Sequence, residues 1–286
     1  MIDLHLHTTA SDGRLSPAQL VARAAAAGLT TISVTDHDTV AAIAEATDVA
    51  AIAKIRVVPG IEITAVDQER DVHMLGYFFD PASATLAALL ERQRALRVSR
   101  VREIAARLDV LGMPVDVETV LLSAAAGPGS SVGRPQLARE LTKAGYVSSV
   151  QEAFDAWLAA GRPAFVPRTG PSPATVVEAV HEAGGVASMA HPGVTGRDDL
   201  IRPLVDRGLD AIEVYHSDHS PQEEQSYQGI ARQLGILVTG GSDFHGEEPA
   251  GVRSRRGTLG VVSLPAEAFA ALEAKARPRQ GFGAAG

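Results

Sequence analysis

Hydrophobic and polar positions in the first 80 residues alternate between the two-residue period of a strand and the longer period of an amphipathic helix. Residues 2–7 alternate as in a strand, and residues 30–35 are β-branched and apolar, as in a strand buried within a parallel sheet. Between them, a serine followed by a proline predicts a helix over residues 17–27, which ends at Gly28. Further elements are predicted as a helix at 40–53 and strands at 56–64 and 72–79. This order favours a parallel α/β architecture.

The alternation stops after Pro81, because the apolar residues that follow recur only at helical spacing. The helices predicted in this part cover 86–111, 135–144 and 150–159. Strand and helix patterns then resume, in segments at 173–184, 186–190, 200–207, 211–215, 221–234, 236–241 and 258–264. We therefore predict a discontinuous barrel-like domain formed by 1–81 and 163–277, a helical insertion domain at 82–162, and a flexible tail, rich in glycine and alanine, at 278–286.

Composition changes this picture little but excludes several classes of protein. Hydrophobic residues make up 45% of the 286 positions and charged residues 21%, without a long apolar run, as in an ordinary globular protein. The chain begins without a basic stretch followed by an apolar one, so we expect a cytoplasmic protein with no membrane partner, and we predict no stable protein partner. Because the chain has no cysteine, disulfides and thiolate metal sites are excluded, and any metal ligand must be nitrogen or oxygen. The net charge of −8 argues against binding nucleic acid over the whole surface, so an anionic substrate must be attracted locally.

Histidines and carboxylates lie where the predicted strands end. His5 and His7 are two residues apart on a strand, so their side chains point to the same face and could share a metal ion. Such a pair on its own is more often incidental. Further candidates lie in or directly after the following strands, namely Asp36, His37, Asp38, Glu62, His73, His191, Asp243 and His245.

The position of these residues at strand ends predicts one shared site. In barrels and open parallel sheets, side chains at the carboxyl ends of the strands converge on a single face. Taken singly, each residue is more often a core histidine or a satisfied polar group in a loop. Together, buried acids and imidazoles without cations would leave unpaired charge or unsatisfied groups, which is strongly unfavourable. We therefore predict a metal site.

Seven short motifs, in this order along the chain, resemble those of the polymerase and histidinol phosphatase (PHP) superfamily. They are His5-Leu6-His7, Ser11-Asp12-Gly13, Thr35-Asp36-His37-Asp38, Gly60-Ile61-Glu62, Val72-His73-Met74-Leu75-Gly76, Ala190-His191-Pro192 and Gly241-Ser242-Asp243-Phe244-His245. The resemblance covers nearly the whole chain. It implies a distorted (β/α)7 barrel, the PHP fold, with a trinuclear metal centre and a small helical insertion.

The resemblance also implies which residues hold three divalent metal ions. The ligands of the first ion are His5, His7, Glu62 and Asp243; the second ion shares Glu62 and adds His73 and His191; the third binds Asp12, His37 and His245. Some members have histidine where this chain has Asp12, so the third site is expected to be richer in oxygen. Imidazole and carboxylate suit manganese, iron or zinc, and the absence of thiolates disfavours zinc alone, so we expect Mn²⁺. The three cations would outweigh the three ligand carboxylates and leave a positive pocket for a phosphate.

Within the superfamily, the chain resembles the branch that hydrolyses nucleoside 3′,5′-bisphosphates and short 5′-phosphorylated RNA. The diagnostic parts are the helical insertion, Gly133-Arg134-Pro135, Gly161-Arg162-Pro163 with Val166-Pro167-Arg168, and residues 213–220. The resemblance implies a phosphoric ester hydrolase that removes the 3′-phosphate of such nucleotides and acts as a 5′-3′ exonuclease on RNA. Two alternatives stay open, a histidinol-phosphatase-like or other small-molecule phosphatase, and an inactive metal-binding module.

Substrate contacts and catalytic roles follow from the same motifs. The predicted phosphate-binding residues are Arg134, Arg162, Arg168 and His219. The predicted catalytic residues are Asp12, His191 and Asp243, which act through a metal-bound hydroxide that attacks phosphorus in line, and His219, as the acid for the leaving group. For Arg134, the alternative is a surface arginine near a helix N-terminus.

The remaining polar residues receive less specific interpretations. His216 is equally well explained as a structural hydrogen-bond partner, and His181 is assigned no role. Two basic stretches are residues 253–256 and the arginines at positions 92, 94, 97, 100 and 102 of the first inserted helix. A solvated surface is the simpler interpretation of both, and contact with a nucleic-acid backbone is the alternative.

Overall fold

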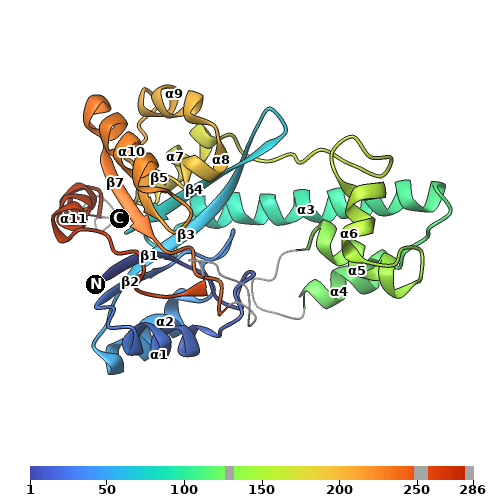
Figure 1. Cartoon of the computed structure of the whole chain (residues 1–286), viewed down its shortest axis with the longest axis horizontal. Helices are drawn as coiled ribbons and strands as arrows, with labels where there is room; N and C mark the ends of the chain where they lie inside the picture. The colour runs from blue at the N-terminus through green and yellow to red at the C-terminus, as the bar shows by residue number, and fades with distance from the viewer. Residues whose placement is uncertain (126–131, 248–256, 281–286) are drawn as a thin grey trace.

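The computed structural model of the chain describes residues 1–125, 132–247 and 257–280, in which seven strands form one strongly curved sheet (Figure 1). The strands follow each other in sequence order across the sheet. They are β1 (Ile2–Leu6), β2 (Thr31–Val34), β3 (Arg56–Asp67), β4 (Arg70–Tyr77), β5 (Val186–Met189), β6 (Ala211–His216) and β7 (Leu237–Gly241). The two edge strands of the sheet, β1 and β7, come together where their chains continue past β7. There the amide of Asp243 donates to the carbonyl of His5 at 2.9 Å, and the amide of His7 donates to the carbonyl of Phe244 at 3.0 Å. The predicted α/β barrel is therefore confirmed.

The direction of β4 differs from the parallel arrangement that the sequence pattern predicted. β4 runs antiparallel to both β3 and β5, whereas the other neighbouring pairs are parallel. The reason is local, because β3 and β4 are joined by a two-residue turn in which Gln68 and Glu69 both have positive φ, at 48° and 64°. Such a turn joins antiparallel strands. Thr64 pairs with His73 across this hairpin, so His73 still lies near the end of the barrel where β3 carries Glu62.

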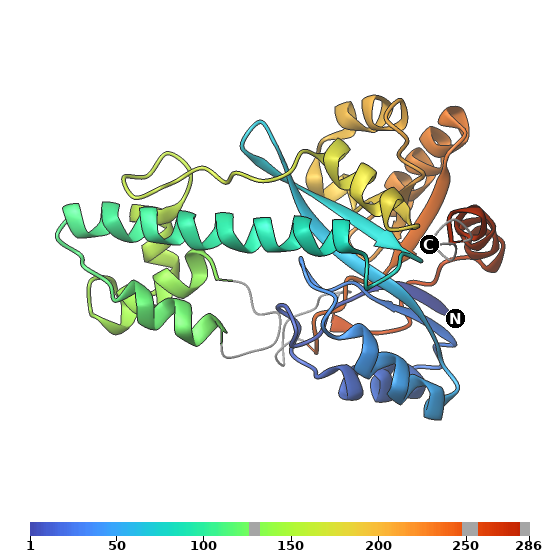
Figure 2. The same cartoon turned by 180° about the vertical axis from the view of Figure 1, so that it is seen from behind.

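Helices cover the outside of the barrel (Figure 2). They are α1 (Pro17–Ala26), α2 (Ile43–Ala53), α7 (Pro173–Glu182), α8 (Pro192–Thr195), the 3-10 helix η2 (Asp198–Leu200), α9 (Ile201–Val205), α10 (Pro221–Leu234) and α11 (Ala266–Gln280). The helix expected at 17–27 begins with the predicted capping box, in which Ser16 and Gln19 bond to each other's backbone amides. No helix within the described residues has both the length and the hydrophobicity needed to cross a membrane.

The last part of the barrel departs from the sequence prediction. Residues 258–264, expected as a regular element, form turns and bends, and the helix that follows, α11, was not predicted. Phe269 and Leu272 of α11 are buried in one apolar cluster with residues of the strands, so the helix packs against the barrel. α11 continues through Pro278 to Gln280 and so includes the first three residues of the predicted tail, and residues 281–286 lie outside the described residues.

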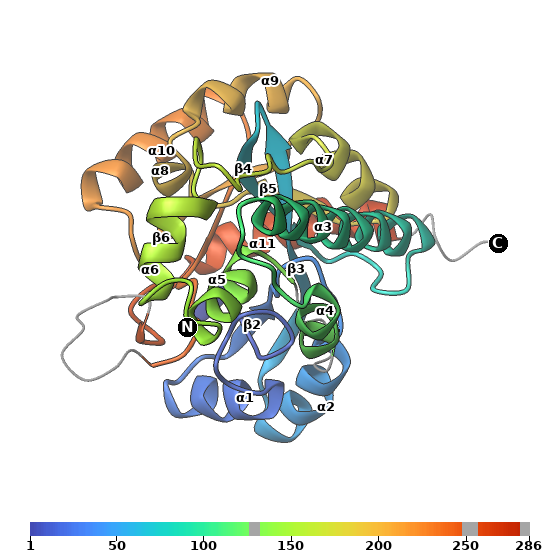
Figure 3. The ribbon, with the colours of Figure 1, turned by 90° about the vertical axis from the view of Figure 1, so that its right-hand side faces the viewer.

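A second group of helices extends from one side of the barrel (Figures 1 and 3). It comprises α3 (Ala84–Val110), α4 (Val117–Ala125), α5 (Arg134–Lys143), α6 (Val150–Ala153) and the π-helix η1 (Phe154–Leu158) that continues α6; α4 was not predicted. The first half of α3 packs with the barrel core through Leu86 and Leu90, whereas its second half belongs to a separate apolar cluster with α4 to α6. Ala164 and Val166 also join that cluster, so the division at residues 82 and 162 stays a prediction.

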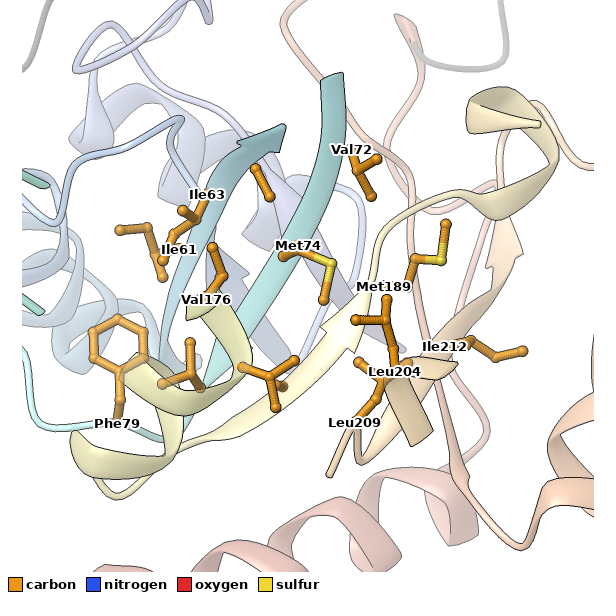
Figure 4. Packing of buried hydrophobic residues seen from close by; sticks show 14 of the residues in the cluster. Ile61, Ile63, Val72, Met74, Phe79, Val176, Met189, Leu204, Leu209 and Ile212 are labelled. Carbon is orange, nitrogen blue, oxygen red and sulfur yellow. The ribbon is translucent and has the colours of Figure 1, made fainter. Parts of the chain in front are cut away.

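The alternation within the strands separates the apolar core from the polar interior of the barrel. Ile61 and Ile63 of β3 point outward and pack against Val176 of α7 and neighbouring apolar side chains (Figure 4). Successive residues of a strand face opposite sides, so Glu62, between these two isoleucines, points into the barrel. The packing of the core therefore fixes the direction of this carboxylate.

Closure of the barrel should be sensitive to Gly241. A Cβ at this position would collide with the backbone nitrogen and the Cβ of His5, neither of which can move without displacing β1. We expect Gly241→Ala to lower the free energy of unfolding by about 1–3 kcal/mol or more. Gly229→Ala in α10 is the matched control, because nothing lies within 4 Å of the added methyl group, and it should raise stability by about 0.5–1 kcal/mol. Urea unfolding measures both, and equal stabilities of Gly241→Ala and the parent would contradict close β1–β7 packing.

Candidate metal centre

The nine predicted ligands gather at one end of the barrel, although six different strands or strand ends supply them. Nitrogen and oxygen atoms of these residues form groups in which all atoms lie within 4.8 Å of each other. The groups are His5, His7, Glu62 and Asp243; His37, Glu62 and His73; and His7, Asp12, His37 and His245. His191 joins through Glu62, as described below.

The first group contains two imidazoles and two carboxylates that face a common point. His5 Nε2 lies 3.2 Å from Glu62 Oε2 and 3.4 Å from Asp243 Oδ1. His7 Nε2 lies 3.2 Å from each of the same two oxygens. All four side chains are buried, so this group is a closed set of nitrogen and oxygen donors of the kind that holds a divalent cation.

The second oxygen of Glu62 faces a different pair of imidazoles. Oε1 lies 2.8 Å from His73 Nδ1 and 3.1 Å from His191 Nε2. On the other side, His37 Nδ1 lies 3.2 Å from Oε2. A carboxylate in this position can bridge two cations, as the sequence prediction of a shared Glu62 requires.

Asp12 lies at the outer side of the centre and is held there by its loop. Its carboxylate oxygens lie 3.2 Å from His245 Nε2, 3.5 Å from His7 Nδ1 and 3.8 Å from His37 Nε2. The buried carboxylate of Asp36 accepts hydrogen bonds from the Thr8 amide, the Thr8 hydroxyl and the Ser11 hydroxyl, at 2.6–2.7 Å. Asp36 therefore positions the loop that carries Asp12.

Glu213 and His216 of β6 support the ligands from behind; a structural role was one of the two interpretations of His216 from the sequence, whereas sequence reasoning gave Glu213 no such role. Glu213 lies 3.0 Å from His5 Nδ1, and it accepts a hydrogen bond of 2.9 Å from the amide of His191. His216 Nε2 lies 3.5 Å from Asp243 Oδ2. A carboxylate behind a ligand imidazole fixes the orientation of the ring and the nitrogen that faces the metal. The signal in the sequence was an acid in the middle of an otherwise apolar strand.

The charges of the centre are strongly coupled in the absence of cations. Burial alone would raise the pKa of Glu62, but the imidazoles of His37, His73 and His5 hold that pKa well below its usual range. Burial disfavours a proton on His7, yet the carboxylates of Asp243 and Glu62, each with an oxygen 3.2 Å from Nε2, raise its pKa to about 10. Burial and the neighbouring charge of His7 lower the pKa of His37 to about 3. Protons on some imidazoles thus balance the carboxylates.

The donor set fits divalent cations. Both ring nitrogens of His7 and Nδ1 of His37 are buried without a hydrogen-bond partner in the described structure. A buried polar group without a partner is costly, and a coordinated cation would satisfy these nitrogens. The set contains imidazoles and carboxylates only, and such ligands suit several divalent metals of the first transition row.

The predicted phosphate-binding residues lie in different surroundings. Arg134, the first residue of α5, is half-buried over the rings of Phe154 and Phe165, each 5.8 Å from its guanidinium carbon. Arg168 Nη1 lies 2.8 Å from Asp71 Oδ2, and Arg162 is exposed. Their roles toward phosphate stay predictions.

His219 is buried beside the centre and is engaged with the backbone. Its Nδ1 lies 2.8 Å from the carbonyl of Val214, and its Nε2 accepts a hydrogen bond of 3.2 Å from the amide of Gly193. In this position His219 supports the turn that follows His191. Neither ring nitrogen is available to a phosphate here, and the predicted roles of His219 in binding and proton donation stay predictions.

The remaining basic residues divide into two sets. Arg92, Arg94 and Arg102 are exposed on α3, as expected of a solvated helix face, whereas Arg97 and Arg100 on the same helix are partly buried. The basic stretch at 253–256 lies outside the described residues. His181 lies at the other end of the strands, where its Nε2 is 2.7 Å from Asp210.

The chain is similar to one known family and to several known proteins. A family model described as the PHP domain matches residues 3–155. The 5′-3′ exoribonuclease of Haemophilus influenzae is 36% identical over 248 residues, which cover 85% of this chain and 89% of that protein. The 3′,5′-nucleoside bisphosphate phosphatase of Chromobacterium violaceum is 32% identical over 252 residues, which cover 85% of this chain and 87% of that protein. A solved structure from Bifidobacterium adolescentis, described as a metal-dependent phosphoesterase, matches with a TM-score of 0.78 at 32% identity and covers 96% of both chains.

The stability of the protein without metal should depend on pH in a defined way. The pKa of His7 in the folded protein, about 10, exceeds its ordinary value of 6.5. The stability that protonated His7 contributes is therefore complete below pH 6.5 and is lost as the pH rises toward 10. The pKa values of Glu62 and Asp243 are lower in the folded protein than their ordinary values. The stability that these carboxylates contribute is therefore lost as the pH falls through their pKa values in the folded protein. We therefore expect the free energy of unfolding of the chelated protein to decline from pH 6.5 to pH 9.

Urea unfolding at a series of pH values, with chelator or with Mn²⁺, measures this dependence. Added Mn²⁺ should raise stability most at the alkaline end, because a cation replaces the protons of the cluster. A flat profile above pH 6.5 in the chelated protein would show that the imidazoles do not hold protons against the carboxylates.

Proposed function

The chain belongs to the PHP domain family, and we propose that within it the chain is a metal-dependent phosphoesterase whose substrates are nucleotides and short RNAs that carry a 5′-phosphate. The observation that carries the proposal is the position of Glu62. Its two buried oxygens lie between two pairs of imidazoles, His5 with His7 and His73 with His191.

The residues that would hold the cations are those grouped around Glu62 and Asp12. In this proposal there are three cations, most suitably Mn²⁺, bound by the three sets of ligands predicted from the sequence. Bound divalent cations lower the pKa of a coordinated water and neutralise charge on a phosphate. The chain's own residues supply the geometry, since Glu213 orients His5 and fixes the backbone of His191, while Asp36 holds the Asp12 loop.

One reaction accounts for both kinds of named relative. A nucleoside 3′,5′-bisphosphate and the first linkage of a 5′-phosphorylated RNA contain the same bond, between phosphorus and the 3′-oxygen of a ribose whose 5′-carbon carries a phosphate. Water adds its oxygen to phosphorus, the bond to the 3′-oxygen breaks, and that oxygen takes up a proton. The products are a nucleoside 5′-monophosphate and either inorganic phosphate or an RNA shortened by one nucleotide.

The source of the proton for the 3′-oxygen is part of the proposal. His219 is the proposed donor, and its ring would first have to exchange the hydrogen bond that Nε2 accepts from Gly193. His219→Gln should then lower turnover most for substrates with a poor leaving group.

Arg134 and Arg168 are proposed to bind phosphate. Arg162 is more exposed to solvent than either of them.

Turnover of adenosine 3′,5′-bisphosphate in the presence of Mn²⁺ tests the function. We expect release of inorganic phosphate and adenosine 5′-monophosphate, complete loss of activity after chelation, and recovery when Mn²⁺ is restored. Preferential hydrolysis of histidinol phosphate would instead favour a small-molecule phosphatase, and metal binding without turnover of any phosphoester would indicate an inactive module.

Substitutions at the centre should have graded effects. Glu62→Gln should lower kcat/KM by more than about 100-fold and reduce the metal content, because it removes the shared ligand charge. Glu213→Gln should cost about 10–100-fold, as for residues that orient metal ligands.

The matched control for these variants is His181→Ala, which removes an imidazole outside the centre. It should keep the parent kcat/KM with a loss of about 1 kcal/mol in stability. Metal analysis and steady-state kinetics give the readout, and a fully active Glu62→Gln enzyme would reject the proposed site.

A further inference from the structure

The ten residues 191–200, which we call the strap, lie beside the metal centre. The strap begins with the predicted ligand His191 and includes α8 and η2. His191 has φ of 24° and ψ of 63°, which lies outside the regions that a residue with a side chain commonly adopts. A backbone conformation of this kind persists only when the surrounding structure holds it. The contacts of the strap therefore determine how the imidazole of His191 is placed.

One ring nitrogen of His191 faces the centre, and the other faces the strap. Nε2 lies 3.1 Å from Glu62 Oε1. Nδ1 lies 3.4 Å from the hydroxyl of Thr195, which is four residues further along the chain at the end of α8. Within residues 1–125, 132–247 and 257–280, this hydroxyl is the hydrogen-bond partner of Nδ1. The side chain of Thr195 is therefore in a position to control which nitrogen carries the ring proton.

The hydroxyl of Thr195 suits both forms of the neutral ring. Its oxygen lies near two groups of His191, Nδ1 and, at 3.3 Å, the carbonyl oxygen. When Nε2 carries the ring proton and donates it to Glu62, the hydroxyl donates to Nδ1. When Nε2 is bare and available to a cation, Nδ1 carries the proton, and the hydroxyl accepts from Nδ1 while it donates to the carbonyl. A methyl group in this position could do neither.

Two other imidazoles of the centre also have an acceptor behind them. Nδ1 of His5 lies 3.0 Å from Glu213, and Nδ1 of His245 lies 2.9 Å from the carbonyl of Asp243. Acceptors in this position keep the ring proton on the outer nitrogen of a metal-binding histidine and set the orientation of the ring. Thr195 stands in the same relation to the first residue of the strap.

The strap is anchored to α10 and the turn before it. The amide of Gly193 donates to His219 Nε2 at 3.2 Å, and the hydroxyl of Tyr227 donates to Asp198 Oδ1 at 3.0 Å. These two contacts hold the beginning and the end of the strap against the part of the barrel that follows it in the sequence.

Arg197 anchors the strap to the β3–β4 hairpin on its other side. Its guanidinium is buried and donates from Nη2 to Asp67 Oδ2 at 2.7 Å and from Nε to Asp199 Oδ1 at 2.9 Å. Asp67 is the last residue of β3, the strand that carries Glu62. A planar guanidinium that bonds two carboxylates at once fixes their relative positions. The strap is thus tied to the strand of the shared carboxylate.

We propose that Thr195 is a positioning residue that prepares His191 for a cation. Its hydroxyl accepts the Nδ1 proton, which leaves Nε2 bare beside Glu62, and Arg197 holds the strap in the place that this contact needs. The inference rests on the proposed function, because it concerns the cations of that site. A neutral hydroxyl is a weaker acceptor than the carboxylate behind His5, so we expect an effect at the lower end of the range for such residues.

Thr195→Val tests the proposal, because valine has nearly the shape of threonine and lacks the hydroxyl. Calorimetry of the chelated and dialysed protein with Mn²⁺ should show that one class of bound ion is weakened about tenfold, and Thr195→Ser should recover the parent affinity. The matched control is Thr47→Val on α2, since the hydroxyl of Thr47 donates to the carbonyl of Ile43, also four residues earlier, at 2.7 Å. It should leave Mn²⁺ binding unchanged.

Parent Mn²⁺ affinity in a folded Thr195→Val protein overturns the proposal. If that variant does not fold, Thr195→Ala serves in the same comparison. The effect should also pass through His191, so in a His191→Ala background Thr195→Val should cause no further loss of Mn²⁺ affinity. A further loss there would show that Thr195 acts on the fold in general, and it would equally overturn the proposal.

Arg197→Gln tests the anchoring of the strap, with Arg202→Gln on the exposed side of α9 as the control. Arg197→Gln should weaken the same class of Mn²⁺ ion that Thr195→Val weakens, and Arg202→Gln should weaken none. Parent affinity in Arg197→Gln would contradict the anchoring.

Comparison of metal binding with turnover separates this inference from the proposed function. Weakened Mn²⁺ binding by Thr195→Val, together with a parent protein that hydrolyses no phosphoester, would support the role of Thr195 and reject the function. Unchanged Mn²⁺ binding by Thr195→Val, together with an active parent enzyme, would reject the role of Thr195 and keep the function.

Discussion

The buried carboxylate of Glu62 is the constraint on which the open end of the barrel depends. A buried carboxylate must be compensated, and here the compensating imidazoles come from several strands: His5 and His7 from β1 and its end, His73 from β4, and His191 directly after β5. The backbone adapts to this requirement. His191, Asp243 and Asp38 all adopt positive φ, at 24°, 55° and 54°, a conformation that costs free energy in residues other than glycine and concentrates at functional sites.

The sequence predicted the features that depend on local patterns. A period of two residues placed Glu62 between Ile61 and Ile63, and capping residues placed the start of α1, so both the barrel and the gathering of the donors could be expected before the structure was known. The direction of β4 depended on a two-residue turn at Gln68 that the pattern of apolar positions does not register. α11 was missed because its apolar residues do not follow a clear helical stripe.

Other features lie beyond the sequence because they arise from contacts between distant segments. Glu213 resembles any acid in a strand until its hydrogen bonds to His5 and His191 are known. The arginines of α3 recur every two or three residues in the sequence, and only their packing separates exposed Arg94 from Arg97 and Arg100. Burial, and contacts between residues that are far apart in the sequence, depend on the fold. They leave no periodic pattern in the sequence.

The length and continuity of α3 have a consequence of their own. This single helix of 27 residues belongs to the barrel core at one end and to the second apolar cluster at the other, and at about 1.5 Å per residue it spans roughly 40 Å. An unbroken helix resists bending, because every bend stretches its internal hydrogen bonds. α3 therefore fixes the distance between the mouth of the barrel and the helices that pack on its second half. A molecule that contacts both parts at once must be long enough to span that distance.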